Sequence, residues 1–256
     1  MRIIARTLRV LQALNDHNGS TVTDLMRHTS LSRPAIYRIL DALIETGFVA
    51  PGRIQYTYKL RSSVRSLSRG YSDDQLIAEV AAPILDQLQN KVIWPTELAT
   101  LRNSRMQLQD STRHDSPMVI DGEVVGRTIS VHNTALGIAY LSRCAPLCKQ
   151  ALMAAMRATV SASDPLPGER RMRQILETAR AKGYASREGG IVDGRPYQTS
   201  TLAVPICARG DARAALAITF FRSAMTIEEA ARKYLADLHR AADTIERRLE
   251  KQPRSQ

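Results

Sequence analysis

Two arginines and a tyrosine, Arg33, Tyr37 and Arg38, stand at spacings that place them on one side of a helix. The other side of the same segment carries apolar residues at intervals of three and four, which must be buried: Ile36, Ile39, Leu40 and Leu43. On an exposed helix, arginine can donate two hydrogen bonds to O6 and N7 of guanine in the major groove of DNA. We therefore predict a DNA-reading set: Ser32, Arg33, Ala35, Tyr37 and Arg38. The alternative is that Arg38 pairs with Asp41 or Asp24 at the surface.

Three short helices are expected to position this set. The first spans residues 6–15, where the leucines fall on one face. The second begins at Thr21 with a Thr-x-x-Asp capping box and stops near Ser30. The third is capped by Ser32 and ends at Gly47. Because so short a turn joins the second and third helices, the segment predicts a helix-turn-helix.

A small β-hairpin should follow the third helix. Residues 48–50 and 54–58 are rich in β-prone side chains, and the turn dipeptide Pro51-Gly52 separates them. Such a hairpin is the wing of a winged helix-turn-helix. Arg53 and Gln55 are placed to contact a phosphate or the minor groove, although a wing arginine can also be merely solvated.

The positive charge is concentrated at the start of the chain. Residues 1–70 hold 11 Lys and Arg against 4 Asp and Glu, a net charge of +7, whereas the remaining residues hold 25 against 21, a net charge of +4. A basic module of this kind fits a polyanion, because its cations release counterions from phosphates. The expected partner is a double-stranded DNA operator.

No stretch of the sequence is apolar enough to span a bilayer, so we expect no membrane partner and a cytoplasmic location. The first residues alternate apolar and charged side chains and predict an amphipathic helix instead of a signal segment. The chain has three unevenly spaced cysteines, Cys144, Cys148 and Cys207, which predict no disulfide framework. The first two are four residues apart, but no second Cys/His pair accompanies them to complete a zinc site. We expect buried thiols, no metal and no cofactor.

The second part of the chain predicts an α+β domain. Helical patterns begin near Ser72, Thr134, Pro146, Glu169 and Thr226. Pro83 should kink or split the first of them. Strand pairs are expected over residues 94–101 with 106–112, and 201–207 with 214–221. The expected division is a winged helix-turn-helix over 1–60, a linker helix over 61–71 and an effector-binding domain over 72–256.

Residues 21–58 resemble the winged helix of the IclR family of transcriptional regulators. Further along, His132-Asn133-Thr134-Ala135-Leu136-Gly137, Lys182-Gly183-Tyr184 and Ala203-Val204-Pro205-Ile206 resemble the family's later motifs in the same order. The resemblance implies a GAF-like effector domain on an antiparallel sheet over 72–250, and a homodimer or dimer of dimers. Many members carry an N-terminal tail before the first helix. This sequence begins almost at its first expected helix, so a tail contribution to dimer contacts is not expected here. Two segments, Val92–Thr96 and Ala224–Glu228, are similar to a member that activates aromatic-acid catabolism.

The start of the helix expected at Thr134 is a candidate anion site. Free N–H groups and the positive end of the helix dipole favour a carboxylate beside His132, Thr134, Ala135 and Leu136. The expected ligand is a small carboxylic-acid effector. The alternative is that Thr134 only caps the helix and His132 packs against the sheet.

Strand residues supply further candidates for the effector site. Arg113 and His114, at the end of a predicted strand, are cations that could clamp the acid, Arg113 through a bidentate fork. Trp94 and Met118 could form an apolar wall, although a lone tryptophan is more often a core residue. The resemblance adds the start of the central strand: Ser200, Thr201 and Leu202.

Other functions fit the sequence less well. An enzyme would need a catalytic motif, and the chain contains no nucleophile elbow, phosphate-binding loop, dinucleotide fingerprint or zinc-protease helix. A ligand-independent DNA-binding repressor would not need a large, nearly neutral second domain. An activator would also contact RNA polymerase.

Overall fold

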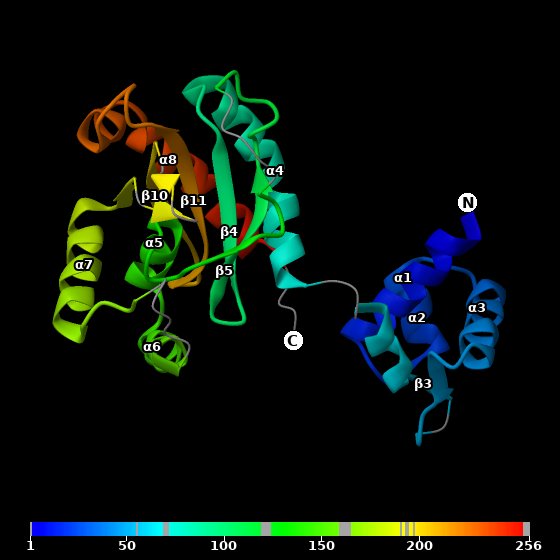
Figure 1. Ribbon diagram of the computed structural model, residues 1–256. Helices are drawn as coiled ribbons and strands as arrows, with labels where there is room; N and C mark the ends of the chain where they lie inside the picture. Colours follow the sequence, from blue (N-terminus) through cyan, green and yellow to red (C-terminus); the bar gives the residue numbers. More distant parts are fainter. Residues whose placement is uncertain are drawn as a thin grey trace. The chain divides into compact units, whose positions relative to one another are not determined.

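The chain divides into two units of different size, Met1–Ser72 and Asp73–Gln256, called unit 1 and unit 2 below (Figure 1). The computed structural model describes residues 2–54, 56–68, 72–118, 124–158, 165–189, 191–192, 195–196 and 198–252. Within these ranges no helix has the length and apolar character needed to cross a membrane.

Unit 1 contains helices and short strands in an order typical of a winged helix. In chain order they are α1 (Arg2–Asp16), β1 (Ser20–Thr21), α2 (Val22–Thr29), α3 (Arg33–Glu45), β2 (Val49–Pro51), β3 (Thr57–Leu60) and the 3-10 helix η1 (Ser62–Ser68). The 3-10 helix lies where the linker helix was expected.

Local capping defines both ends of α2. The Thr21 hydroxyl accepts a hydrogen bond from the Asp24 N–H at 3.2 Å, and the Asp24 carboxylate accepts one from the Thr21 N–H at 3.1 Å. The hydrogen bonds from Thr21, aided by the charges of Arg27 and His28, lower the pKa of Asp24. Helix α2 then ends at Ser30 in the left-handed conformation, with φ 57°. The predicted capping box and helix-turn-helix are confirmed.

The three helices of unit 1 bury one apolar core. The residues predicted to face inward on α3 are buried in it, together with side chains of α1, α2 and β2: Val10, Leu14, Val22, Leu25, Ile36, Ile39, Leu40, Leu43 and Val49. Burial of the apolar face fixes which side of α3 meets solvent.

The wing is a three-stranded antiparallel sheet in the order β1-β3-β2. Its strand β3 begins at Thr57, three residues later than predicted, because Ile54 and Tyr56 lie in the turn before it. Both the N–H and the hydroxyl of Thr57 donate to the Ile54 carbonyl, at 3.2 and 2.6 Å. Strand β1 consists of two residues and was not predicted.

Unit 2 is built on one larger sheet. Its elements are α4 (Asp73–Val92), β4 (Thr96–Arg102), β5 (Arg105–Ser111), β6 (Thr128–Ile129), α5 (Ala135–Arg143), α6 (Pro146–Ala158), α7 (Glu169–Lys182), β7 (Ala185–Glu188), β8 (Ile191–Val192), β9 (Arg195–Pro196), β10 (Thr199–Ala208), β11 (Asp211–Phe221) and α8 (Ile227–Glu250). Six strands pair antiparallel in the order β6-β5-β4-β11-β10-β7, and β8 pairs with β9. The predicted α+β class is confirmed.

Two tight turns close the hairpins that were predicted. Asn103 and Ser104 join β4 to β5 with φ of 49° and 60°, and Arg209 and Gly210 join β10 to β11 with φ of 56° and 83°. Two successive residues with positive φ match the twist of a two-residue hairpin loop. The prediction that Pro83 could split the first helix is wrong, since α4 runs through it. Burial of Ala81, Ile84 and Leu85 against the sheet outweighs the hydrogen bond that proline cannot make.

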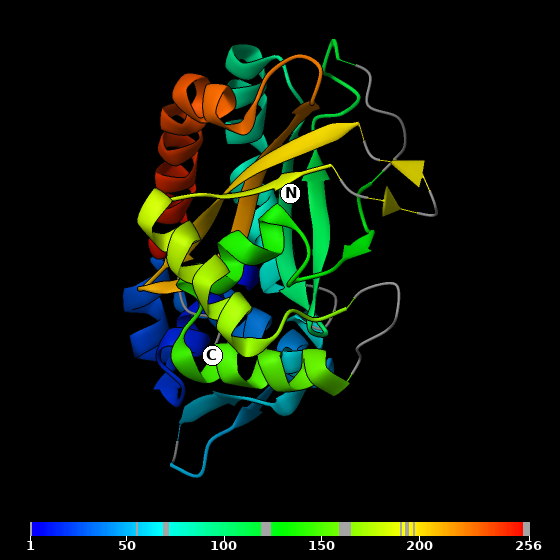
Figure 2. The same cartoon turned by 60° about the vertical axis from the view of Figure 1, so that its left-hand side comes forward.

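Each central strand contributes to two cores, one on each face of the sheet (Figures 1 and 2). On the first face, leucines, isoleucines and valines of the strands pack against α4 and α8. On the second face, alanines of the strands pack against α5 and α7: Ala99, Ala203, Ala215 and Ala217. The small side chains let α5 lie close to the sheet.

Gly137 shows how tightly the start of α5 is packed. A Cβ atom added there would lie 2.1 Å from the Val131 carbonyl oxygen. We expect Gly137→Ala to lower the free energy of unfolding by about 1–3 kcal/mol in urea titrations, because the backbone must move to admit the methyl group. Without the clash, alanine would favour the helix by about 1 kcal/mol.

Gly168→Ala is the control, because a Cβ at Gly168 meets no atom within 4 Å. It should cost less than about 1 kcal/mol, the usual range for a change of N-cap residue. Equal stability of wild type and Gly137→Ala would contradict the close packing of α5.

Candidate nucleic-acid interface and effector site

Helix α3 presents the predicted DNA-reading residues to solvent. Ser32, Arg33, Tyr37 and Arg38 are exposed, and Ala35 is half-buried. Ser32 occupies the N-cap position but makes no side-chain capping bond, so its hydroxyl can meet a ligand. Exposed donors at the start of the second helix are what base recognition by a helix-turn-helix requires.

The alternative role for Arg38 has no support in the contacts of unit 1. Asp24, one of its two possible partners, pairs instead with Arg27 at 2.5 Å. Neither Asp24 nor Asp41 forms an ion pair with Arg38 in the described part of the chain. The charge of Arg38 therefore remains available to a partner molecule.

The wing tip carries apolar side chains that the sequence did not single out. Arg53 is exposed, as a phosphate contact requires, and Gln55 lies outside the described residues. Ile54 and Tyr56 beside them are 76% and 77% exposed. Both residues are β-prone and were predicted to lie in a strand. They lie instead in the turn held by Thr57, where their side chains are exposed.

The candidates for the effector site separate onto the two faces of the sheet in unit 2. Trp94 and Leu202 are buried in the core under α4 and α8, and Met118 packs against the same core. Trp94 makes edge contacts with Phe220 and Phe221 at 6.2 and 6.0 Å between ring centroids. Strand alternation places Ser200 on this first face as well, paired with Phe220 across the ladder. These four residues therefore do not share a face with Thr201.

The start of α5 and Thr201 lie on the second face of the sheet. The Thr134 hydroxyl accepts from the Gly137 N–H at 3.1 Å and donates to the Ser130 carbonyl at 2.6 Å, so it caps the helix. His132 is buried, with Nδ1 at 3.3 Å from the Ser130 hydroxyl. The side chains of Ala135 and Leu136 belong to the core, which leaves their backbone N–H groups as the possible ligands.

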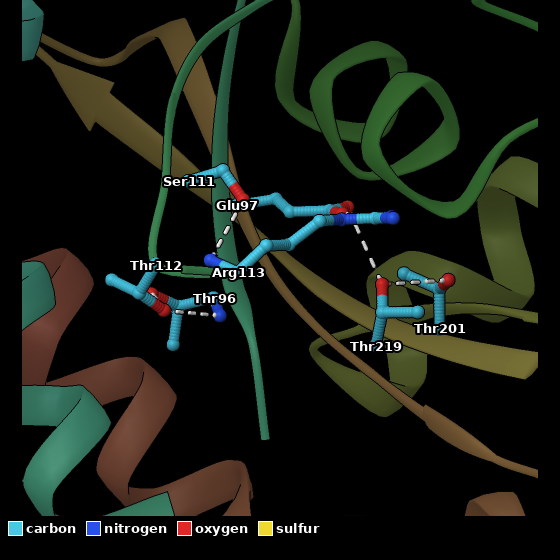
Figure 3. A network of polar contacts seen from close by, with 7 residues as sticks. All are labelled: Thr96, Glu97, Ser111, Thr112, Arg113, Thr201 and Thr219. Atoms are coloured by element: carbon cyan, nitrogen blue, oxygen red, sulfur yellow. Dashed lines mark hydrogen bonds and ion pairs between the residues drawn. The ribbon is translucent and has the colours of Figure 1, made fainter. Parts of the chain in front are cut away.

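Arg113 forms a buried ion pair with Glu97, which was not among the predicted site residues (Figure 3). Arg113 Nε and Nη2 donate to Glu97 Oε1 at 2.9 and 2.6 Å. The side chains of Arg113 and Glu97 are 15% and 7% exposed. Arg113 follows β5 in a turn, next to the exposed His114, and reaches back to β4. Its fork is thus already engaged by a carboxylate of the protein.

Two threonines extend this network across the sheet. Thr219 Oγ1 donates to Glu97 Oε2 at 3.3 Å, and Thr201 Oγ1 lies 3.3 Å from Thr219 Oγ1 (Figure 3). A separate network on the first face joins Thr96, Thr112 and Gln89, with 3.0 Å between the two threonine hydroxyls. Glu97, Thr219 and Thr201 thus form a polar row on three adjacent strands of the second face.

Arg113→Ala should destabilise unit 2 strongly, because it leaves the Glu97 carboxylate buried without its partner. Loss of one member of a buried ion pair costs about 3–5 kcal/mol, whereas loss of an exposed one costs about 0–1 kcal/mol. Arg157→Ala is the matched control, since Arg157 pairs with Glu169 at the surface. Urea unfolding of both variants checks the difference, and equal losses would contradict the burial of the pair.

Sequence profiles of a known family match both units. The IclR helix-turn-helix domain matches residues 4–51, and the C-terminal domain of the bacterial transcriptional regulator IclR matches residues 70–247. An uncharacterized HTH-type transcriptional regulator of Haemophilus influenzae is 22% identical over 140 residues, 54% of this chain and 52% of that protein. The chain thus matches about half the length of this curated relative.

Solved structures share the fold over nearly the whole chain. An IclR homolog from Microbacterium hydrocarbonoxydans, complexed with 4-hydroxybenzoate, is 23% identical and covers 98% of this chain and 100% of its own, with a TM-score of 0.55. The regulators from Alicyclobacillus acidocaldarius and Thermotoga maritima are 21% and 17% identical, each covering 98% of this chain and 99% of their own, with TM-scores of 0.58 and 0.57. Since the family profiles match most of its length, the chain belongs to the IclR family of DNA-binding bacterial transcriptional regulators.

Proposed function

We propose that the chain binds an operator through α3 and the wing, and that a small carboxylic acid bound in unit 2 controls this binding. Arg38 carries the first half of the proposal, because it is exposed opposite the buried face of α3 and has no ion-pair partner among the described residues. Ser32, Arg33, Ala35, Tyr37 and Arg38 would enter the major groove, and Arg53 would contact a phosphate or the minor groove. Gln55 remains a predicted contact outside the described residues.

The start of α5 supports the second half of the proposal. Thr134 satisfies the Gly137 N–H, which leaves the N–H groups of Ala135 and Leu136 without a helical partner. These groups and the positive end of the helix suit a carboxylate. Arg113 is no longer our candidate for the clamp, because Glu97 already neutralises its charge.

An aromatic acid is the first class of effector to test. The related regulator that was solved with 4-hydroxybenzoate supports this choice by analogy. Two segments, Val92–Thr96 and Ala224–Glu228, look most like the activator of 3-(3-hydroxyphenyl)propionate catabolism. The effector, activation and contact with RNA polymerase are proposals, and ligand-independent repression is the alternative. We propose no catalytic role.

A homodimer, or a dimer of dimers, would present two α3 helices to an inverted repeat. The outer face of α1 supports such an assembly, since Ile4 and Leu8 are large, apolar and more than half exposed one turn apart. A second copy could cover them. The location in the cytoplasm follows from the proposed DNA partner.

Arg38→Ala should weaken binding to a duplex selected by the protein from a random pool. Loss of an arginine that reads a base costs about 1–3 kcal/mol, or roughly 5- to 150-fold in affinity. Fluorescence anisotropy at fixed salt measures the change. Arg173→Ala, an equally exposed arginine on α7 of unit 2, is the control and should bind like wild type. Equal affinities of all three proteins would remove Arg38 from the interface.

A carboxylic acid should raise the melting temperature of the full-length protein, because a ligand that binds only the folded state stabilises it by mass action. At about 100 times its Kd the gain is about 2.7 kcal/mol. A thermal-shift screen would compare benzoate, its hydroxy and fluoro derivatives, and small aliphatic acids. If no acid shifts the melting temperature at millimolar concentration, the effector class is wrong while the proposal for DNA binding stands.

A further inference from the structure

Glu97 places a carboxylate beside buried alanines of the neighbouring strand positions on the second face of the sheet. Its ladder partner on β11 is Ala217, and the next residue on the same face of β4 is Ala99. Both alanines are buried in the core under α5. A buried ion pair is a poor source of stability, because the cost of removing two charges from water offsets their attraction. The presence of Glu97 here therefore calls for a role other than stability.

The two oxygens of this carboxylate are unequally occupied. Oε1 accepts both hydrogen bonds from Arg113, at 2.9 and 2.6 Å. Oε2 accepts one bond from the Thr219 hydroxyl at 3.3 Å, longer than the usual range of about 2.5–3.0 Å between two oxygens. A carboxylate offers roughly four acceptor sites. Oε2 can therefore accept a shorter bond from another donor.

The site lies beyond the start of α5. Ala145, just after the helix, donates its N–H to the side chain of Asp211, the first residue of β11, at 2.7 Å. The first residues of α5, Ala135 and Leu136, share one core with Ala217, the ladder partner of Glu97. The start of α5 therefore lies on the sheet face that carries Glu97 and Thr219. An effector bound by the N–H groups at this helix start would extend toward Glu97.

Charge decides which end of the effector meets Glu97. An acid group placed against Arg113 would have to displace the Glu97 carboxylate and leave it buried beside a second negative charge. A hydroxyl group has no such cost and donates a charge-assisted hydrogen bond to a carboxylate. The neighbouring hydroxyls of Thr219 and Thr201 can rotate to accommodate it.

We propose that Glu97 determines the specificity of the effector site by accepting a hydrogen bond from a hydroxyl group of the effector. Hydroxy acids are then bound in preference to acids that lack this donor, and Arg113 positions the Glu97 carboxylate. The inference rests on the proposed function, because it takes the carboxylate of the effector to lie at the start of α5.

The test compares pairs of ligands of nearly equal size in the full-length protein. Titration calorimetry would measure the Kd of 3- and 4-hydroxybenzoate and of 3- and 4-fluorobenzoate, since fluorine fills the place of the hydroxyl without donating. A hydrogen bond to a charged group gives an expected preference of about 10- to 100-fold for one hydroxy isomer over its fluoro counterpart. In Glu97→Gln the ratio should fall about 5- to 10-fold, because the neutral amide oxygen accepts a weaker hydrogen bond than the carboxylate does.

Two further proteins keep the test decisive. Glu97→Gln combined with Arg113→Gln restores a neutral pair and replaces the single variant if that variant does not fold; its ratio should fall by a similar factor. Glu169→Gln removes an exposed carboxylate that pairs with Arg157 on the surface, and it should retain the wild-type ratio.

The outcomes separate this inference from the proposed function. Equal binding of hydroxy and fluoro acids by wild type, or an undiminished preference in both Glu97 variants, overturns the role of Glu97 but leaves the acid effector in place. If none of the four acids binds at millimolar concentration, the proposed aromatic-acid effector fails and this inference fails with it.

Discussion

The structure of unit 2 depends on the alternation of neighbouring side chains in a sheet that is covered on both faces. Each buried apolar residue of β4, β10 and β11 belongs to one of two cores, and a shift by one position would exchange them. Large aliphatic residues face α4 and α8, and alanines face α5. The same alternation directs Glu97 to the face of α5, where its charge must be paired. The ion pair with Arg113 is therefore a consequence of the register.

Arginine serves two purposes in the two units, and its surroundings decide which. Arg38 is exposed on α3 without an ion-pair partner in the described residues, so its charge can act on a polyanion. Arg113 is largely buried and neutralised by Glu97, so it orders a polar row instead of attracting an anion. The excess positive charge of residues 1–70 fits this division, because the proposed DNA contacts depend on charge and the proposed effector contacts depend on hydrogen bonds.

The winged helix could be predicted from the sequence because its signals are local. The capping box at Thr21 and the apolar spacing of Ile36, Ile39 and Leu40 act within one or two helical turns. The candidate effector site depends on pairings between distant strands, which residue spacing does not predict. Thr201 and Leu202 looked equivalent as strand residues, yet the register separates them onto opposite faces. Glu97 lies 16 residues before Arg113, across a hairpin with an irregular register near Leu98, so their pairing could not be predicted from residue spacing.

The proposed regulation requires that a ligand bound in unit 2 change the affinity of unit 1 for DNA. Fluorescence anisotropy of a selected duplex with the full-length protein tests it directly, in the absence and presence of a saturating acid that raises the melting temperature. A coupling free energy of about 1–3 kcal/mol, usual for such regulation, predicts a change in the Kd for DNA of roughly 5- to 150-fold. A Kd for DNA that is the same with and without the bound acid would contradict the account.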